Sequence, residues 1–317
     1  MSTLCTNIDD IRAAAKRIAL HAHRTPILRC TALDQFLDAK LTFKCENFQK
    51  VGAFKFRGAC NAIRSLDEAE LQRGVATHSS GNHAAALALA AKLAGSTAHI
   101  VMPSNARAIK KSAVAGYGAT ITYCEPTLEA RESTLAEIIE NEGRVEIHPY
   151  NDVRIIAGQG TAALELMEDV DDLEIVMAPV GGGGLLSGTS IAVSESQPSI
   201  KVFGAEPIQA DDAFRSLQSG VIEPSIEPQT IADGLLTCLG DLTYPILQER
   251  CDGIVTVSEE SIVQAMRLVW ERMKIIIEPS SAVPVAALLE NRSQVPGHRV
   301  GIILSGGNVD LARLPWS

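Results

Sequence analysis

Segments with strand-like and helix-like patterns alternate along nearly the whole chain, and this alternation restricts the fold more than any other feature. Short runs rich in β-branched residues are typical of buried strands, and they lie at 74–79, 98–103, 119–124, 174–180, 201–207, 253–257 and 299–307. Alanine- and leucine-rich segments with helical spacing, such as 83–95 and 127–143, lie between them. Strands that alternate with helices form mostly parallel sheets with helices on both faces. The sequence therefore predicts an α/β protein.

Length, charge and cysteine content narrow the class of protein further. With 317 residues, of which 46% are hydrophobic, the chain is long enough for two domains or one large domain. The net charge of −10 argues against nucleic acid as a partner, because phosphate binding needs a basic surface. The seven cysteines include no CxxC pair, which argues against a disulfide framework or a zinc site and favours a reducing compartment. No secretory signal or membrane-length apolar stretch is visible, so we expect a cytoplasmic protein without a membrane partner.

Loops of glycine and small polar residues follow three of the expected strands. They are THSSGNHA at 77–84, PVGGGGLLSG at 179–188 and LSGGN at 304–308. In open α/β sheets, ligands bind outside the carboxyl ends of the strands. The three loops are therefore expected to share one binding site.

Four consecutive glycines, Gly181, Gly182, Gly183 and Gly184, follow an expected strand and precede a helix-like segment. Glycines allow positive φ and leave no side chains in the way, so their N–H groups can converge on an anion at a helix N-terminus. This pattern predicts a phosphate-binding loop; the alternative is a flexible turn. No GxGxxG or GxxxxGK[ST] motif occurs, which disfavours dinucleotides and nucleoside triphosphates.

A lysine lies between two phenylalanines in the segment Phe54-Lys55-Phe56. Removing an ammonium group from water lowers its pKa, and a neutral amine is a nucleophile suited to Schiff-base chemistry. Lys55 is therefore a candidate catalytic residue. The alternative is that its side chain extends past the aromatic rings to solvent.

Three further groups of residues are candidates for binding. Ser79, Ser80 and Asn82 are expected to open a helix, where they could hold a carboxylate or only cap the helix. The second group, Ser305-Gly306-Gly307-Asn308, is either part of the site or a plain turn. The third group is Glu206, Ala210 and Asp212, whose two carboxylates and one carbonyl suit a hard cation such as Mg²⁺ or Ca²⁺. The alternative for this group is an acidic turn in contact with solvent.

The order of these motifs resembles that of the fold type II pyridoxal-phosphate (PLP) enzymes, in the serine racemase and serine/threonine dehydratase group. The resemblance is also close to the 3-hydroxyaspartate ammonia-lyases. It is carried by KCENFQKVGAFKFRGACNAI, THSSGNHAAALALAAKLAG, YGATITYCEPTLEAR, IAGQGTAALEL, PVGGGGLLSG, AEPIQADDAF, TIADGL, LVWERMKIIIEPSSAV and LSGGNVDL. It implies two domains, each with a mostly parallel sheet flanked by helices. The large PLP-binding domain would comprise 1–73 and 152–317, and the small domain 74–151.

The resemblance also implies how the cofactor is held. Lys55 matches the lysine that forms the Schiff base, and Phe54 matches the residue that packs on the cofactor ring. Asn82 matches the residue that bonds the 3-hydroxyl oxygen, Gly234 the backbone over the other ring face, and Ser305 the partner of the pyridine nitrogen. The phosphate loop corresponds to Gly181, Gly182, Gly183 and Gly184, and a divalent cation (Mg, Ca or Mn) to Glu206, Ala210 and Asp212.

The implied substrate contacts are Ser79, Ser80, Asn82, His83 and Arg131. Ser80 departs from ordinary threonine dehydratases, which resemble SAGNHA with alanine at this position. A hydroxyl there could protonate the α-carbon from the face opposite Lys55, as racemisation requires. Arg131 aligns with an arginine near the substrate in the racemases, whereas its spacing from Thr127 alone indicates a solvated helix residue.

The activity implied by the resemblance is removal of water and ammonia from a small β-hydroxy amino acid. The expected substrate is 3-hydroxyaspartate, which would give oxaloacetate, or serine, which would give pyruvate, or both. The alternative activity is racemisation of serine or aspartate, with the dehydratase reaction as a side activity. A non-catalytic amino-acid-binding protein on the same fold is a third interpretation, disfavoured because the lysine and the glycine loop are both present. A homodimer is also expected.

Overall fold

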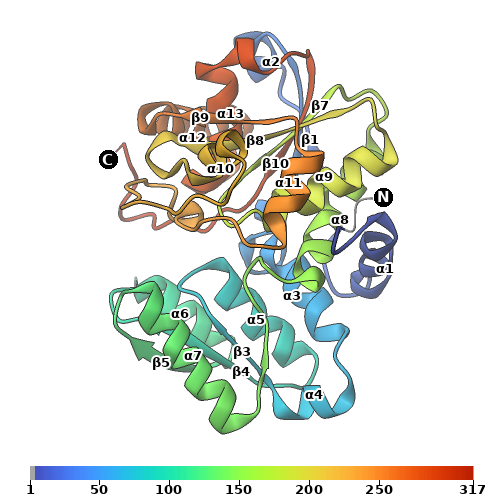
Figure 1. Ribbon diagram of the computed structural model, residues 1–317. Coiled ribbons are helices and arrows are strands. Elements are labelled where there is room, and N and C mark those ends of the chain that lie inside the picture. Colours follow the sequence, from blue (N-terminus) through green and yellow to red (C-terminus); the bar gives the residue numbers. More distant parts are fainter. Residues whose placement is uncertain (1–3, 107, 317) are drawn as a thin grey trace.

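A computed structural model describes residues 4–106 and 108–316 of the chain. It contains two sheets, which lie in the upper and lower parts of Figure 1. The larger sheet has six strands, in the order β1-β2-β10-β7-β8-β9, and every neighbouring pair except β1 and β2 is parallel. Its strands are β1 (Ile27–Leu28), β2 (Lys40–Cys45), β7 (Ile175–Pro179), β8 (Lys201–Pro207), β9 (Gly253–Val257) and β10 (Arg299–Leu304).

The smaller sheet has four parallel strands in the order β5-β4-β3-β6. They are β3 (Val75–His78), β4 (Ala98–Pro103), β5 (Thr120–Cys124) and β6 (Val145–Glu146). All seven strands expected from the sequence are present, which confirms the α/β class. The last one ends at Leu304 rather than 307, because the SGG residues that follow turn away from the sheet into a loop.

Helices cover both faces of each sheet, as the alternating pattern predicts. They are α1 (Ile8–Ile18), α2 (Thr31–Leu37), α3 (Lys55–Arg64), α4 (Glu68–Arg73), α5 (Asn82–Leu93), α6 (Ala108–Gly116), α7 (Leu128–Glu142), α8 (Val153–Asp169), α9 (Gly184–Ser196), α10 (Asp212–Ser219), α11 (Thr243–Arg250), α12 (Glu259–Met273) and α13 (Pro279–Glu290). Successive residues of β3 show the two faces: Val75 packs with α3 and α5, and Ala76 packs with Leu135 and Ile138 of α7.

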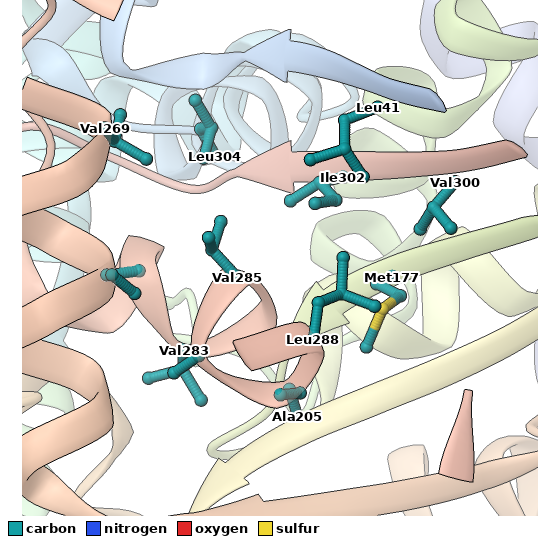
Figure 2. Close-up of a cluster of buried hydrophobic side chains, with 14 of the residues drawn as sticks. Leu41, Met177, Ala205, Val269, Val283, Val285, Leu288, Val300, Ile302 and Leu304 are labelled. Carbon is teal, nitrogen blue, oxygen red and sulfur yellow. The ribbon is translucent and has the colours of Figure 1, made fainter. Parts of the chain in front are cut away.

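The larger sheet is buried between two helical layers. Helices α1, α8, α9 and α11 contribute to the hydrophobic cluster on one side, and α2, α12 and α13 contribute to the cluster on the other. In Figure 2, Val285 and Leu288 of α13 face Val300 and Ile302 of β10. Fully burying an aliphatic side chain of this size stabilises the fold by about 1.5–3 kcal/mol.

Helix α3 packs against both α5 and α8, so it links the cores of the two sheets. A network of buried ion pairs anchors α3 in the protein interior. The Arg57 side chain is fully buried and donates to both oxygens of Glu46 (2.7 and 2.9 Å) and to both oxygens of Glu165 (2.7 and 2.8 Å). Lys44, at the end of β2, also contacts Glu165 (2.5 Å). The two cations and two carboxylates together make the network neutral.

All seven cysteines are free. Among residues 4–106 and 108–316, no helix is long and apolar enough to cross a membrane.

Candidate active site

A cavity of about 650 Å³ lies at the carboxyl ends of strands from both sheets. The loops that follow β3, β7 and β10 all line it, as expected from the rule for open α/β sheets. The predicted cofactor and substrate residues that line this cavity are Phe54, Lys55, Ser79, Ser80, Asn82, His83, Arg131, Gly181, Gly182, Gly183, Gly184, Gly234 and Ser305. The structure therefore brings together every residue that the sequence assigned to the cofactor or the substrate.

Lys55 is the first residue of α3, and its side chain enters the cavity. Its Nζ donates to the carbonyl oxygen of Pro149 (2.7 Å) and lies 5.2 Å from the centre of the Phe54 ring. Burial lowers the pKa of Lys55 to about 8, as the sequence predicted. Of the two phenylalanines beside Lys55 in the sequence, only Phe54 lies at the cavity, because Phe56 points into the core beside α5.

The glycine loop leads directly into α9, whose first residue is Gly184. Only Gly183, the residue before the helix, has a positive φ, of 86°. The other glycines are needed for close packing rather than for unusual backbone angles. A Cβ on Gly182 would clash with the Tyr150 ring, and one on Gly184 would lie 2.8 Å from Gln159 Oε1. The cavity wall here consists of backbone at a helix N-terminus, which fits a phosphate group.

Helix α5 starts at Asn82, and the residue before it, Gly81, provides no side-chain cap. The interpretation of Ser79, Ser80 and Asn82 as helix caps is therefore wrong. The Ser79 hydroxyl instead accepts a hydrogen bond from the N–H of Gly81 (3.3 Å). His83 donates through Nε2 to the carbonyl oxygen of Ile147 (3.2 Å), and burial lowers its pKa well below the usual value. It is a neutral residue of the cavity wall.

Arg131 lines the cavity from α7 and is half-buried rather than fully solvated. Its Nε donates to the carbonyl oxygen of Thr127 (3.2 Å), one helical turn earlier. This contact fixes the guanidinium group at the cavity and uses only one of its five N–H donors.

Four cavity residues carry chemistry that the sequence analysis missed: Tyr150, Lys110, Asp233 and Glu278. Lys110 and Asp233 form an ion pair (2.5 Å) between α6 and the segment before α11. Burial, followed by the nearby Asp233 carboxylate, raises the pKa of Glu278 to about 8. The available signal for Glu278 was its place directly before Pro279 at the start of a helix. For the other three, the sequence gives no signal.

Glu206 and Asp212 lie near the end of β8 and at the start of α10, outside the cavity wall. The solvated acidic turn considered for them is wrong, because both side chains are fully buried. Glu206 accepts hydrogen bonds from the N–H groups of Ala213 (3.1 Å) and Phe214 (2.9 Å). Neither carboxylate oxygen of Asp212 has a hydrogen bond of normal geometry. Burial is the main cause that raises the pKa of Glu206 well above its usual value and that of Asp212 to about 7.

These two carboxylates and the nearby Ala210 carbonyl fit a hard cation, because a cation would compensate two buried acidic groups that repel one another. In the part of the chain that the structure describes, no cluster of three or more His, Cys, Asp or Glu side chains could hold a metal. Backbone carbonyls and water would have to complete the ligand set.

Together, the two mostly parallel sheets, the buried lysine and the side-chain-free loop at a helix N-terminus define the site of a PLP-dependent enzyme. The chain belongs to the family of pyridoxal-phosphate-dependent enzymes, whose family model matches residues 18–306. It has the fold type II architecture of this group.

Relatives from several organisms match over almost the whole chain. Serine racemase of Dictyostelium discoideum is 54% identical over 311 residues, covering 97% of this chain and 96% of the relative. The β-hydroxyaspartate dehydratase of Paracoccus denitrificans is 50% identical over 309 residues, covering 98% of each. The crystal structure of the Dictyostelium enzyme superposes with a TM-score of 0.93, at 53% identity, covering 98% of this chain and 100% of that structure.

Proposed function

We propose that this protein is a PLP-dependent ammonia-lyase that eliminates water from 3-hydroxyaspartate, serine or both. The products would be ammonia and oxaloacetate or pyruvate. The observation that carries the proposal is that a lysine with a lowered pKa, the glycine loop and Arg131 all line one cavity. The 50% identity to a β-hydroxyaspartate dehydratase supports the choice of reaction.

The cofactor would be held by Lys55, Phe54, Asn82, Gly234, Ser305 and the four-glycine loop, as the resemblance implies. When bound, it supplies an electron sink for negative charge at the substrate's α-carbon. Lys55 would take the α-proton at Nζ, and a pKa of about 8 supports this role because the amine can release and regain a proton near neutral pH. The Pro149 carbonyl orients that amine by accepting its hydrogen bond. Ser305 offers a neutral hydroxyl where aminotransferase-type folds use a carboxylate, which favours elimination over transamination.

The test of the reaction is a panel of serine, threonine and both 3-hydroxyaspartate diastereomers. Release of ammonia and 2-oxo acid is measured beside inversion at the α-carbon on the same sample. Ammonia from at least one β-hydroxy amino acid is expected. If the α-carbon is inverted but none of the four amino acids releases ammonia, the lyase assignment is wrong.

Racemisation is the second candidate function, favoured by Ser80 in the cavity and by the 54% identity to a serine racemase. Ser80→Ala should suppress racemisation more than elimination, because only racemisation needs a proton donor on the second face of the α-carbon. The ratio of the two rates with serine is the measurement. Equal losses in both reactions would show that Ser80 mainly positions the substrate.

Arg131 is proposed to bind the second carboxylate of 3-hydroxyaspartate. Arg131→Ala should cost roughly 1.5–3 kcal/mol of transition-state binding with the diacid and little with serine, because only the diacid loses a charge-assisted contact. The measurement is kcat/KM for both substrates. If both suffer alike, or if the wild type uses serine far better than either diastereomer, serine is the substrate.

We also propose a divalent cation (Mg, Ca or Mn) at Glu206, Asp212 and the Ala210 carbonyl. Removing the cation with a chelator should lower the melting temperature, and Mg²⁺ or Ca²⁺ should restore it. Because the pKa of Asp212 is raised to about 7, the cation must displace a proton below that pH, so its affinity should rise as the pH increases through 7. Glu206→Gln should remove the cation effect. Identical melting and kinetics with and without cation would exclude the site.

The domain division, the oligomeric state and the location complete the proposal. Residues 1–73 and 152–317 would form the large domain and 74–151 the small one, a division compatible with the strands of the two sheets. The enzyme would act as a homodimer in the cytoplasm on a small amino acid.

A further inference from the structure

The Asn82 side chain at the cavity is held by hydrogen bonds to two other side chains. Its Oδ1 accepts a hydrogen bond from Asn308 Nδ2 (2.9 Å), and its own Nδ2 donates to Glu278 Oε1 (2.8 Å). A primary amide has two N–H donors, so one hydrogen on Asn82 Nδ2 is left for a ligand. Rotating the amide by 180° would bring its N–H groups against those of Asn308 Nδ2. The neighbours therefore permit one orientation.

Asn308 is itself held in one orientation from the other side. Its Nδ2 donates a second hydrogen bond to the backbone carbonyl of Val51 (2.7 Å), a group that can only accept. The chain leaves space for the Asn308 amide at Gly52, where a Cβ would lie 2.7 Å from Asn308 Oδ1. The backbone at Val51 thus determines the orientation of Asn308, and Asn308 determines that of Asn82.

Glu278 completes the arrangement as a buried acceptor. Only 4% of its surface is exposed, and a Cβ on Gly306 would lie 2.6 Å from its Oε1, so the carboxyl group has little room to move. Its backbone N–H donates to the Gly306 carbonyl (3.0 Å), which joins the start of α13 to the loop that carries Ser305 and Asn308. The loop of Ser305 and Asn308 thus contacts Asn82 directly, and the segment that precedes Lys55 is linked to Asn82 through Val51 and Asn308.

We infer that Asn308 and Glu278 are positioning residues that orient the Asn82 amide, so that its free N–H is presented to the oxygen substituent of the cofactor ring. This inference rests on the proposed assignment of Asn82 to the cofactor. An N–H donated to that oxygen favours its ionised form, and the ionisation of this oxygen sets the balance of the visible and near-ultraviolet absorption bands of the bound cofactor. The arrangement should therefore be visible in the holoenzyme spectrum without any turnover.

The test compares Asn308→Ala with the wild-type holoenzyme by absorbance and by cofactor dissociation. We expect a lower ratio of visible to near-ultraviolet absorption and about tenfold weaker cofactor binding, the effect of one lost hydrogen bond. Asn308→Ala in an Asn82→Ala background should have no further effect on either property, because the contribution passes through Asn82. Glu278→Ala should resemble Asn308→Ala, whereas Glu278→Gln keeps an oxygen acceptor and should restore the wild-type spectrum.

Asn47→Ala is the matched control. Its Nδ2 donates to the carbonyl of Ile276 (3.0 Å), so it braces the same region without contacting Asn82. It should leave the band ratio unchanged. A wild-type spectrum and affinity in Asn308→Ala, or an undiminished effect in the Asn82→Ala background, would overturn the inference. If the protein binds the cofactor but releases no ammonia from any substrate, the proposed reaction is refuted. The inference about Asn308 and Glu278 is then still tested, because the absorption spectrum does not depend on turnover.

Discussion

Lys55→Ala should reduce turnover at least about 1,000-fold, roughly 4 kcal/mol of activation free energy, and should remove the cofactor's absorption near the visible edge. The reason is that Lys55 provides the proposed covalent link and the proposed base, and no other described amine is placed to replace both. Lys110, the other lysine at the cavity, is committed to an ion pair with Asp233. Absorbance and steady-state kinetics on the same sample measure the two effects.

Lys50→Ala is a suitable control for this experiment. Lys50 also lies beside a phenylalanine, with Nζ 5.5 Å from the centre of the Phe56 ring, but it does not line the cavity. It should keep the absorption band and most of the activity. If Lys55→Ala retained a tenth or more of wild-type turnover, a loss under roughly 1.4 kcal/mol, Lys55 would not be the essential amine.

The second large effect concerns stability. Arg57→Met should lower the free energy of unfolding by about 3–5 kcal/mol, because it leaves the fully buried Glu46 carboxylate without its cation. Chemical denaturation followed by circular dichroism gives the value. Arg57→Met combined with Glu46→Gln should recover part of the loss, since the double variant no longer buries an unpaired charge.

An exposed ion pair provides the control for Arg57. Arg267 and Glu271 are one helical turn apart on α12 (2.7 Å), with side chains 58% and 50% exposed. Arg267→Met should change stability by less than about 0.5 kcal/mol. If the two arginine variants lost the same stability, the buried network would not be the source of the effect.

The sequence predicted the parts of the fold that follow from local patterns. The apolar β-branched runs that form β4, β8 and β9 were located to the residue, because a strand buried on both faces is hydrophobic throughout. The sequence-based prediction missed β2, whose segment KLTFKC carries lysines that look like surface residues. Lys44 is in fact buried because Glu165 on α8 neutralises it, and no local pattern indicates that pairing. Strands β1 and β6 are only two residues long and leave no periodic signal.

In the candidate site too, local features were predictable and long-range contacts were not. The loops at strand ends and Lys55 were predictable, because each is recognised from the residue types within a short segment. The reason why Gly182 must be a glycine was not predictable, because that reason is close packing against Tyr150, which comes from another part of the chain. The contacts of Asn82 with Glu278 and Asn308 likewise join residues about two hundred positions apart. Side-chain orientation depends on such contacts, and a single sequence does not reveal them.

The position of β10 in the larger sheet has a consequence for how the chain folds as it is made. β10 lies between β2 and β7, so this sheet lacks a central strand until residues 299–304 have left the ribosome. Until then β2 and β7 each present an edge of unpaired backbone N–H and C=O groups, which favours aggregation and chaperone binding. The smaller sheet draws all its strands from 75–146 and can be paired much earlier. Since Ser305 follows β10 directly, completion of the sheet and of the binding cavity should be a single late event in biosynthesis.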